Sequence, residues 1–295
     1  MKRRSFLETV GLSVLGSVIL SEFNSFGSDD ESLSEIGLQL YTVRNEMKKD
    51  PVSTLKKVAD IGYKYVECTG YENGKFYDNT KENFRKILND LGLKMLSGHV
   101  DTGFNKGEKT MGLRYRFDSV CEDAVFIGQK YLGVGYMPIE ERKTIDDYKK
   151  FANLLNKSAE IAKKYGLTFF HHNHDFEFVP ITGIIPYDLL LKETDKNLVK
   201  FELDHYWTTK ANVDSINIMK NNSGRFPLWH IKDMDNTPDR AFTEVGTGII
   251  DYGKIFKNKK IAGGDLIFIE QDSCKKIPPL ESIELSFKNL KNLKF

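Results

Sequence analysis

Three histidines and two acidic residues crowd together directly after one apolar segment. The segment at 167–170 reads LTFF, and the next seven residues, 171–177, read HHNHDFE. Leaving that many polar groups buried without partners would cost about 1–3 kcal/mol for each group. Imidazole and carboxylate groups bind divalent transition metals, and a free imidazole transfers protons near neutral pH. The stretch therefore predicts a site for a metal ion or another polar ligand.

Further histidines and acids follow other apolar segments in the same way. Each lies at or just past the C-terminal end of a predicted strand: they are His99, His205, His230, Glu67, Asp204 and Glu270. Scattered structural residues would not share this position. Where parallel strands close into a barrel, their C-terminal ends meet at one rim, and active sites lie there. The pattern predicts that these side chains converge.

Strand-like and helix-like segments alternate from residue 36 to the end of the chain. Strands are predicted at 36–41, 63–68, 93–98, 131–134, 167–170, 198–203, 227–229 and 266–269. Helices are predicted at 51–61, 81–91, 113–127, 146–165, 186–192, 214–220, 252–256 and 280–293. Eight such pairs in one chain predict the α/β class and a single (β/α)8 TIM barrel domain spanning 32–295.

A doubly wound open sheet is the competing architecture. That fold would place a glycine-rich phosphate turn after the first strand. The residues there, 41–44, read YTVR and contain no glycine. The sequence therefore favours the closed barrel.

The charge balance and the cysteines exclude several classes of protein. The chain has 43 basic and 42 acidic residues and a formal net charge of +1. Without a basic block or stripe, it is not expected to bind nucleic acid. Its three cysteines, Cys68, Cys121 and Cys274, are widely spaced and form neither a CxxC pair nor a complete disulfide framework.

Residues 1–30 predict a signal peptide. MKRRSFL is followed by a moderately apolar run at 10–20, which is too short and too rich in glycine and serine for a membrane span. The paired arginines resemble the twin-arginine export signal. We therefore expect a periplasmic protein with no stable membrane insertion after cleavage. A general secretory signal and an uncleaved anchor are the alternatives.

One carboxylate or imidazole from each of the last four strands could hold a metal. The candidates are Glu177, Asp204, His230 and Glu270. A mixed set of this kind suits one divalent ion, with manganese, cobalt, zinc and magnesium all compatible. The sequence does not choose among these metals.

The chain resembles the xylose-isomerase-like barrel superfamily, in its sugar phosphate isomerase/epimerase group. The motifs that carry the resemblance are IGLQLYTVR, HHNHDFEF, ELDHYW, WHIKDM, EVGTGIIDY and FIEQD, which together span nearly all of the chain after residue 32. The resemblance implies one metal held by Glu, Asp, His and Glu from strands five to eight. Asp204, His230 and Glu270 match the last three.

The first glutamate of that set departs from the family pattern. Many relatives carry it in a Glu-Asn-His run, where this chain has His172-Asn173-His174. Glu177 lies three residues further on and is the preferred ligand here, with His172 and His174 as the alternatives.

Six further residues near the predicted rim could bind a sugar. They are Tyr41, Glu67, His99, Trp207, Lys232 and Gln271. Lys232 follows His230 by two residues and should face the same side, where it could hold a hydroxyl or carbonyl oxygen. The aromatic rings could stack on a sugar face, although core packing is the competing interpretation.

We expect a metal-dependent isomerase or epimerase that acts on a small unphosphorylated carbohydrate. A base removes a proton next to a carbonyl, and the metal stabilises the resulting enediolate. Glu270 and one of Glu177, His172 or His174 would transfer protons.

Two alternatives remain open at this stage. A lyase, dehydratase or hydrolase acting on keto-sugars or 3-keto-glycosides would use the same proton abstraction, and a non-catalytic periplasmic sugar-binding protein would need no base. The DNA-repair endonuclease branch of the superfamily is disfavoured by the near-neutral charge. A homo-oligomer is left open.

Overall fold

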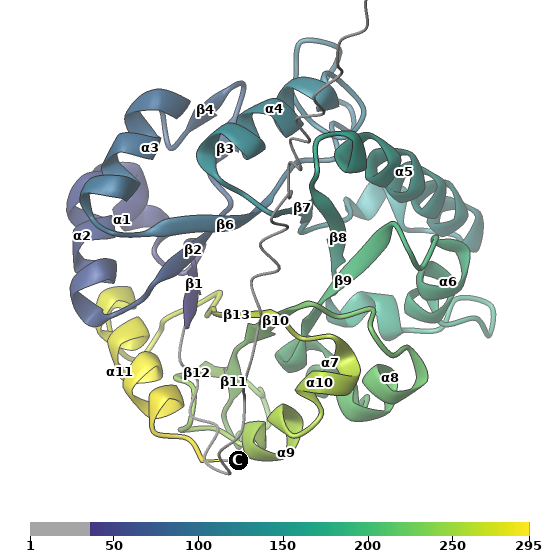
Figure 1. Ribbon diagram of the computed structural model, residues 1–295. Helices are drawn as coiled ribbons and strands as arrows, with labels where there is room; N and C mark the ends of the chain where they lie inside the picture. The colour runs from purple at the N-terminus through teal and green to yellow at the C-terminus, as the bar shows by residue number, and fades with distance from the viewer. Residues whose placement is uncertain (1–35, 295) are drawn as a thin grey trace, which may run out of the picture. The chain divides into compact units, whose positions relative to one another are not determined.

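Eight parallel strands close into a barrel in the computed structural model, which describes residues 36–294 (Figure 1). The predicted signal peptide, 1–30, lies outside the described residues. In order around the barrel the strands are β1 (Gly37–Gln39), β2 (Tyr65–Cys68), β6 (Lys94–His99), β7 (Tyr131–Val134), β8 (Thr168–His172), β9 (Val199–Asp204), β10 (Leu228–Ile231) and β13 (Leu266–Ile269), which pairs again with β1. The structure confirms the predicted (β/α)8 TIM barrel, because each observed strand overlaps a predicted one.

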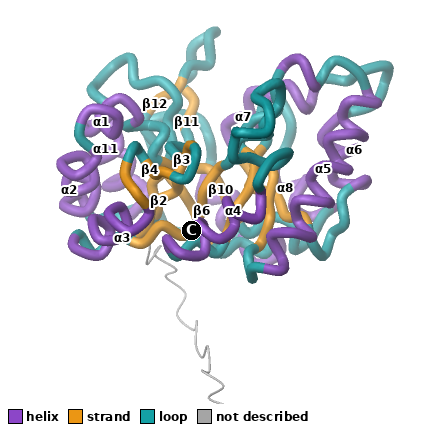
Figure 2. The backbone as a smooth tube through the Cα atoms, turned by 90° about the horizontal axis from the view of Figure 1, so that it is seen from above, coloured by secondary structure: helices purple, strands orange, loops and turns teal. Residues whose placement is uncertain are grey.

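Helices surround the barrel on its outside, as the tube view also shows (Figure 2). They are α2 (Pro51–Ile61), α3 (Lys81–Asp90), α4 (Phe117–Ile127), α5 (Ile145–Lys164), α6 (Pro186–Glu193), α8 (Ser215–Asn221), α9 (Tyr252–Phe256), α10 (Lys259–Ala262) and α11 (Pro279–Lys291). Capping side chains determine where several of these helices begin. The Asp50 carboxylate caps α2 by accepting from the Ser53 amide at 3.0 Å, and Thr144 and Asp147 form a capping box at α5.

Helix α4 begins four residues later than predicted. The preceding residues form a tight turn, in which Gly112 and Tyr115 exchange backbone hydrogen bonds of 2.9 and 3.2 Å. Arg116 then adopts a left-handed backbone with φ of 53°, which no helix can continue through. The apolar periodicity of the segment did not reveal this turn.

Short elements that were not predicted extend from the C-terminal ends of the strands. A three-stranded sheet of β3 (Tyr71–Glu72), β4 (Lys75–Phe76) and β5 (Asn79–Thr80) follows β2. A second pair, β11 (Asp233–Met234) and β12 (Phe242–Thr243), follows β10, while the short helices α1 (Arg44–Lys49) and α7 (His205–Lys210) follow β1 and β9. All of them lie on the strand-end side, where the sequence places the candidate site.

An apolar plug fills the barrel beneath the strand ends. Its buried members are Tyr65, Phe170, Leu228, Leu266 and Phe268. The interior is so tight that a Cβ at Gly37 would overlap the Tyr65 ring. His99 and His230 lie against this plug, with ring centroids 5.6 Å from Phe170 and 6.3 Å from Phe268 respectively. The plug therefore separates the polar rim from the opposite end of the barrel.

Replacing Phe201 with alanine is expected to destabilise the fold by about 3–5 kcal/mol. The side chain is fully buried between β9 and the outer helices, and its ring lies 5.6 Å from that of Tyr187 and 6.3 Å from that of Phe226. Urea denaturation measures the change. The control is Leu285→Ala on the exposed side of α11, which should shift stability by less than about 1 kcal/mol.

Within residues 36–294, no helix combines the length and the apolar character needed to cross a bilayer.

Candidate active site

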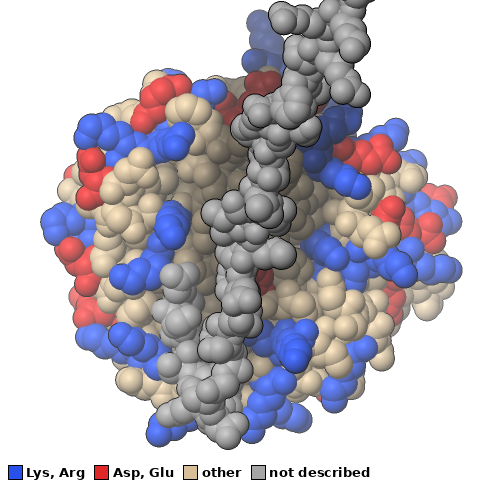
Figure 3. Space-filling view, in the orientation of Figure 1, with Lys and Arg blue, Asp and Glu red and all other residues tan. Residues whose placement is uncertain are grey.

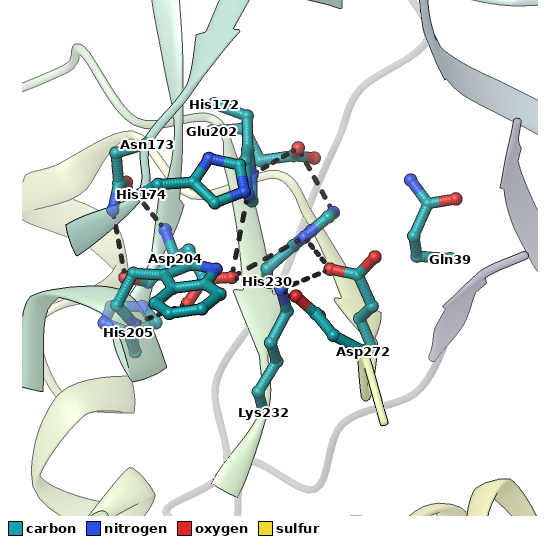
Figure 4. Close-up of polar contacts among 12 residues, drawn as sticks. Gln39, His172, Asn173, His174, Glu202, Asp204, His205, His230, Lys232 and Asp272 are labelled. Carbon is teal, nitrogen blue, oxygen red and sulfur yellow. Dashed lines mark hydrogen bonds and ion pairs between the residues drawn. The ribbon is translucent and has the colours of Figure 1, made fainter. Parts of the chain in front are cut away.

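Four neighbouring strands each bring one metal-binding side chain to the same point. His172 ends β8, Asp204 ends β9, His230 lies in β10, and Glu270 directly follows β13. One ligand atom from each of the four lies within 4.8 Å of all the others, and all four residues are buried. Figure 4 shows His172, Asp204 and His230 converging from their separate strands.

Backbone contacts fix the direction of Asp204. Its amide donates to Asn173 Oδ1 at 2.9 Å, which ties the end of β9 to that of β8. Its Oδ1 accepts from the Trp207 amide at 2.9 Å and so caps α7. The second oxygen, Oδ2, is thereby left to face the two histidines.

The spacing of these atoms fits a divalent metal. Asp204 Oδ2 lies 3.8 Å from His172 Nε2 and 3.9 Å from His230 Nδ1. Metal–ligand distances of about 2.0–2.2 Å place adjacent ligand atoms about 3–3.6 Å apart. Asp204 Oδ2 and His230 Nδ1 are buried and make no hydrogen bond of good geometry, although Lys232 Nζ lies 3.0 Å from the first and Glu270 Oε2 lies 2.8 Å from the second. The donor set of two imidazoles and two carboxylates suits zinc, cobalt, manganese or iron.

A second layer of charged groups lies deeper in the barrel, directly above the plug. Glu202 Oε2 lies 2.8 Å from His99 Nε2 and 3.1 Å from both His172 Nδ1 and His230 Nε2. Glu67 Oε1 lies 2.8 Å from His230 Nε2 and accepts from the Gln39 amide. Burial opposes a charge on His99, but the carboxylates of Glu67 and Glu202 raise its pKa to about 10. His99 is therefore an imidazolium near neutral pH.

Lys232 places an ammonium beside the candidate ligands. Its Nζ lies 3.0 Å from Asp204 Oδ2, 2.6 Å from Glu270 Oε2 and 2.7 Å from Asp272 Oδ1. Burial opposes this charge, but the three carboxylates together raise the lysine pKa well above its usual value. Burial likewise opposes a charge on His230, but Glu202 and Glu270 raise its pKa well above the usual value. One ammonium and two imidazoliums do not balance the five buried or nearly buried carboxylates around them, so the cluster has room for a further cation.

His174 lies at the edge of the cluster as a neutral imidazole. Burial lowers its pKa well below the usual value, and the nearby Lys232 lowers it further. The ring stacks on Phe176 at 5.4 Å and contacts Tyr136 and Trp207 at 5.4 and 5.3 Å. Its Nδ1 has no hydrogen-bond partner. These aromatic contacts hold an unprotonated base in one orientation.

A cavity of about 870 Å³ opens above the cluster. Six of the site residues predicted from the sequence line it: Tyr41, His99, His172, His174, Lys232 and Glu270. The cavity continues over Tyr71 and Asn73 of the β3–β5 insertion. Gly135 also lines it, and a Cβ at this position would overlap His99 Nδ1. The glycine therefore leaves that nitrogen facing the cavity.

The predicted metal ligand Glu177 lies apart from this cluster. It is fully buried in a 3-10 turn, Asp175–Phe178, where its Oε1 lies 2.6 Å from His171 Nε2 and its Oε2 accepts from the His174 amide at 3.0 Å. Strand alternation turns His172 into the barrel and His171 outward against Phe151. At strand five it is thus His172, and not Glu177, that lies with Asp204, His230 and Glu270, and Glu177 does not line the cavity.

Three predicted sugar-binding residues also lie away from the cavity. Glu67 is fully buried beneath it, where it contacts Gln39 and His230. The Gln271 side chain points outward, where it donates to Glu244 at 3.4 Å and accepts from Ser282 at 3.1 Å. Trp207 lies behind His174 and Lys232, whose ammonium is 5.5 Å from the indole centroid.

Not every histidine belongs to the rim cluster. His205 was predicted to converge with the others, but its Nδ1 contacts Ser215 Oγ at 3.0 Å and its ring packs on Trp229. It begins α7, and the first helical turn carries it behind the barrel wall. Four of the six histidines, His99, His172, His174 and His230, face the cavity or the cluster beneath it.

Sequence reasoning missed Glu202 and Asp272. Glu202 is detectable by strand periodicity, because side chains two residues apart in a strand face the same side and Glu202 precedes Asp204 by two residues. Asp272 lies past the end of β13, where this alternation does not apply. Gln39, which donates to Glu67, precedes the candidate Tyr41 by two residues.

Comparison with known proteins places the chain in a family. A family model described as a xylose isomerase-like TIM barrel matches residues 55–291. An inosose dehydratase from Clostridium perfringens is 25% identical over 278 residues, covering 86% of this chain and 85% of that protein.

Solved structures agree with this placement. A sugar phosphate isomerase/epimerase from Parabacteroides distasonis has 29% identity and a TM-score of 0.76, covering 88% of this chain and 98% of the other. A 3-keto-D-glucoside 4-epimerase from E. coli has a TM-score of 0.65 over 88% of this chain and 99% of the other; at 16% identity this likeness shows the fold alone. The match to the family model covers most of the sequence, and the chain belongs to the xylose isomerase-like TIM barrel family.

Proposed function

We propose that this chain is a divalent-metal-dependent carbohydrate enzyme that abstracts a proton next to a carbonyl group and acts as an isomerase or epimerase. One observation carries the proposal. His172, Asp204, His230 and Glu270 bring buried ligand atoms within 4.8 Å of one another at the floor of a cavity, with a neutral imidazole in its wall. Relatives named as inosose dehydratase and as sugar phosphate isomerase/epimerase support a carbohydrate substrate.

His174 is the group best placed to take the proton. His172 has one ring nitrogen against Glu202 and the other toward Asp204, which leaves it no free nitrogen for the substrate. Burial opposes ionisation of Glu270, but Lys232 and His230 lower its pKa well below the usual value, so its carboxylate is a weak base. His174 is neutral and lines the cavity. Glu270 is the second predicted acid/base group, but its low pKa leaves it no proton to give, so the protonated His174 would return the proton in an isomerisation.

Two cationic side chains of this chain could stabilise the negative charge that develops on a substrate oxygen. Lys232 and His99 both line the cavity, and each carries N–H groups that can donate to a substrate oxygen. A bound metal would act as a Lewis acid toward the carbonyl group, which lowers the barrier by several kcal/mol in comparable sites.

The cavity favours a second candidate, a lyase acting on keto-sugars or keto-glycosides. Its volume of about 870 Å³ is near the upper end of the ~300–1,000 Å³ typical of sites for drug-sized ligands. The space continues over the β3–β5 insertion, where a substituent larger than a single sugar ring could lie. His174 would remove the proton next to the carbonyl, the bond to the substituent on the following carbon would break, and the leaving group would take a proton from His99.

The predicted export supports an unphosphorylated substrate, because sugar phosphates are cytoplasmic metabolites. We propose a periplasmic location on the same ground. On the face shown in Figure 3, basic and acidic side chains are interspersed, which agrees with a small neutral substrate rather than with nucleic acid.

Incubation with free ketoses and keto-glycosides in deuterated water tests the proposal. We expect the metal-loaded protein to incorporate deuterium next to the carbonyl, and chelation to lower that rate by at least about 100-fold until metal is restored. Mass spectrometry separates the candidates, since an isomerase retains the substituent and a lyase releases it. Neither exchange nor release in metal-loaded protein would indicate a binding protein and would overturn the proposal.

A further inference from the structure

We propose that Glu202 is a positioning residue that decides which ring nitrogen His172 and His230 turn toward the metal. The inference rests on the proposed metal site and goes beyond it, because Glu202 touches neither the cavity nor the remaining ligands. Figure 4 shows Glu202 on one side of the His230 ring and Asp204 on the other.

The two rings face Glu202 with opposite nitrogens. His172 turns Nδ1 toward Glu202 Oε2, at 3.1 Å, and Nε2 toward Asp204. His230 turns Nε2 toward the same Oε2, also at 3.1 Å, and Nδ1 toward Asp204 and Glu270. An ionised carboxylate only accepts hydrogen bonds, so the nitrogen that faces it carries the proton. In His172 the opposite nitrogen then has the lone pair that a metal requires, whereas His230 Nδ1, 2.8 Å from Glu270 Oε2, must release its proton when the metal binds.

The surroundings of Glu202 make this arrangement rigid. The residue is fully buried, and Phe170 of the plug closes the barrel below His99. His99 Nε2 lies between Glu202 Oε2, at 2.8 Å, and Glu67 Oε1, at 3.2 Å. Its positive charge compensates these two fully buried carboxylates. Three imidazoles thus meet one carboxylate oxygen, and rotation of either ligand ring would break its contact with that oxygen.

A competing interpretation is that these groups form a second cation site. His99, His172, Glu202 and His230 also place one possible ligand atom each within 4.8 Å of one another. Two ions would share the rings of His172 and His230, so both nitrogens of each ring would need to be deprotonated. That requirement favours a positioning role for Glu202 over a second cation site.

The Glu202→Gln variant tests the inference, because it keeps the shape of the side chain and removes the charge that selects a protonated nitrogen. We expect zinc affinity, measured by competition with a chelator, to fall by about 10–100-fold. The absorption spectrum of the cobalt-substituted protein should change, since a merely structural residue would leave the ligand geometry intact. Glu244→Gln is the matched control: this glutamate is also buried but contacts Ser282 at 3.0 Å, away from the histidines, and both readouts should stay unchanged.

Nitrogen-15 NMR of the histidine rings gives a readout that does not need the metal. In metal-free wild-type protein, His172 should carry its proton on Nδ1, and Glu202→Gln should populate the other tautomer. Unchanged tautomers, or unchanged zinc affinity and cobalt spectrum, would overturn the role of Glu202. Binding of two zinc ions by the wild type, with one lost in the variant, would also overturn it in favour of a second cation site. A wild type that binds no zinc but shows the tautomer change would contradict the proposed function alone.

Discussion

Replacing His174 with alanine is expected to lower the turnover number by about 10²–10⁴-fold, the usual contribution of general acid–base catalysis. The variant removes the neutral imidazole that lines the cavity and whose Nδ1 has no partner within the described residues. Metal affinity should stay within a few-fold of the wild type, because His174 is not among the four clustered ligands. Steady-state kinetics measure the turnover number, with the ketose or keto-glycoside that incorporates deuterium as the substrate. Metal titration measures the affinity.

Rescue by added imidazole provides the control for His174. A small base that enters the emptied space should restore part of the turnover without changing the metal content. A turnover number within tenfold of the wild type would contradict the role of base, and so would a loss of activity explained entirely by metal loss.

Replacing His172 with alanine is expected to weaken metal binding by more than about 100-fold, beyond the 10–100-fold typical of groups that only support ligands. His172 Nε2 faces Asp204 Oδ2 across the centre of the cluster. Glu177→Gln is the informative partner variant, because Glu177 contacts His171 and the His174 amide instead. It should keep its metal and lose about 1–3 kcal/mol of stability through the weakened buried hydrogen bonds.

Calorimetric metal titration and urea denaturation of the two variants distinguish these roles. Equal metal loss in both would mean that Glu177 reaches the metal in solution, contrary to its position in the turn. Retention of metal by His172→Ala would remove His172 from the ligand set.

The barrel and three of its clustered residues were predictable because strand periodicity and strand ends are local features. Asp204, His230 and Glu270 each lie at the end of an apolar segment, and parallel strands bring such ends together whatever the loops do. Glu177 was not predictable in the same way. It lies in a 3-10 turn after the strand, where the direction of a side chain depends on backbone angles that residue spacing does not encode.

The insertion between β2 and α3 is a second part of the structure that the sequence did not predict. Its strands have two residues each, too short for alternation to be visible, and the turn between β3 and β4 uses Asn73 and Gly74, both with positive φ. The Asn-Gly pair is a hairpin signal, but the apolar pattern around it is too brief to support one. The part of the cavity over Tyr71 and Asn73 therefore emerges only from the structure.

Anomalous scattering from a crystal of the manganese- or zinc-loaded protein tests the central claim most directly. The account predicts one ion about 2.0–2.2 Å from His172 Nε2, Asp204 Oδ2, His230 Nδ1 and a carboxylate oxygen of Glu270. The account would be contradicted by an ion bound through Glu177. It would also be contradicted if crystals of fully active protein contained no ion at this cluster.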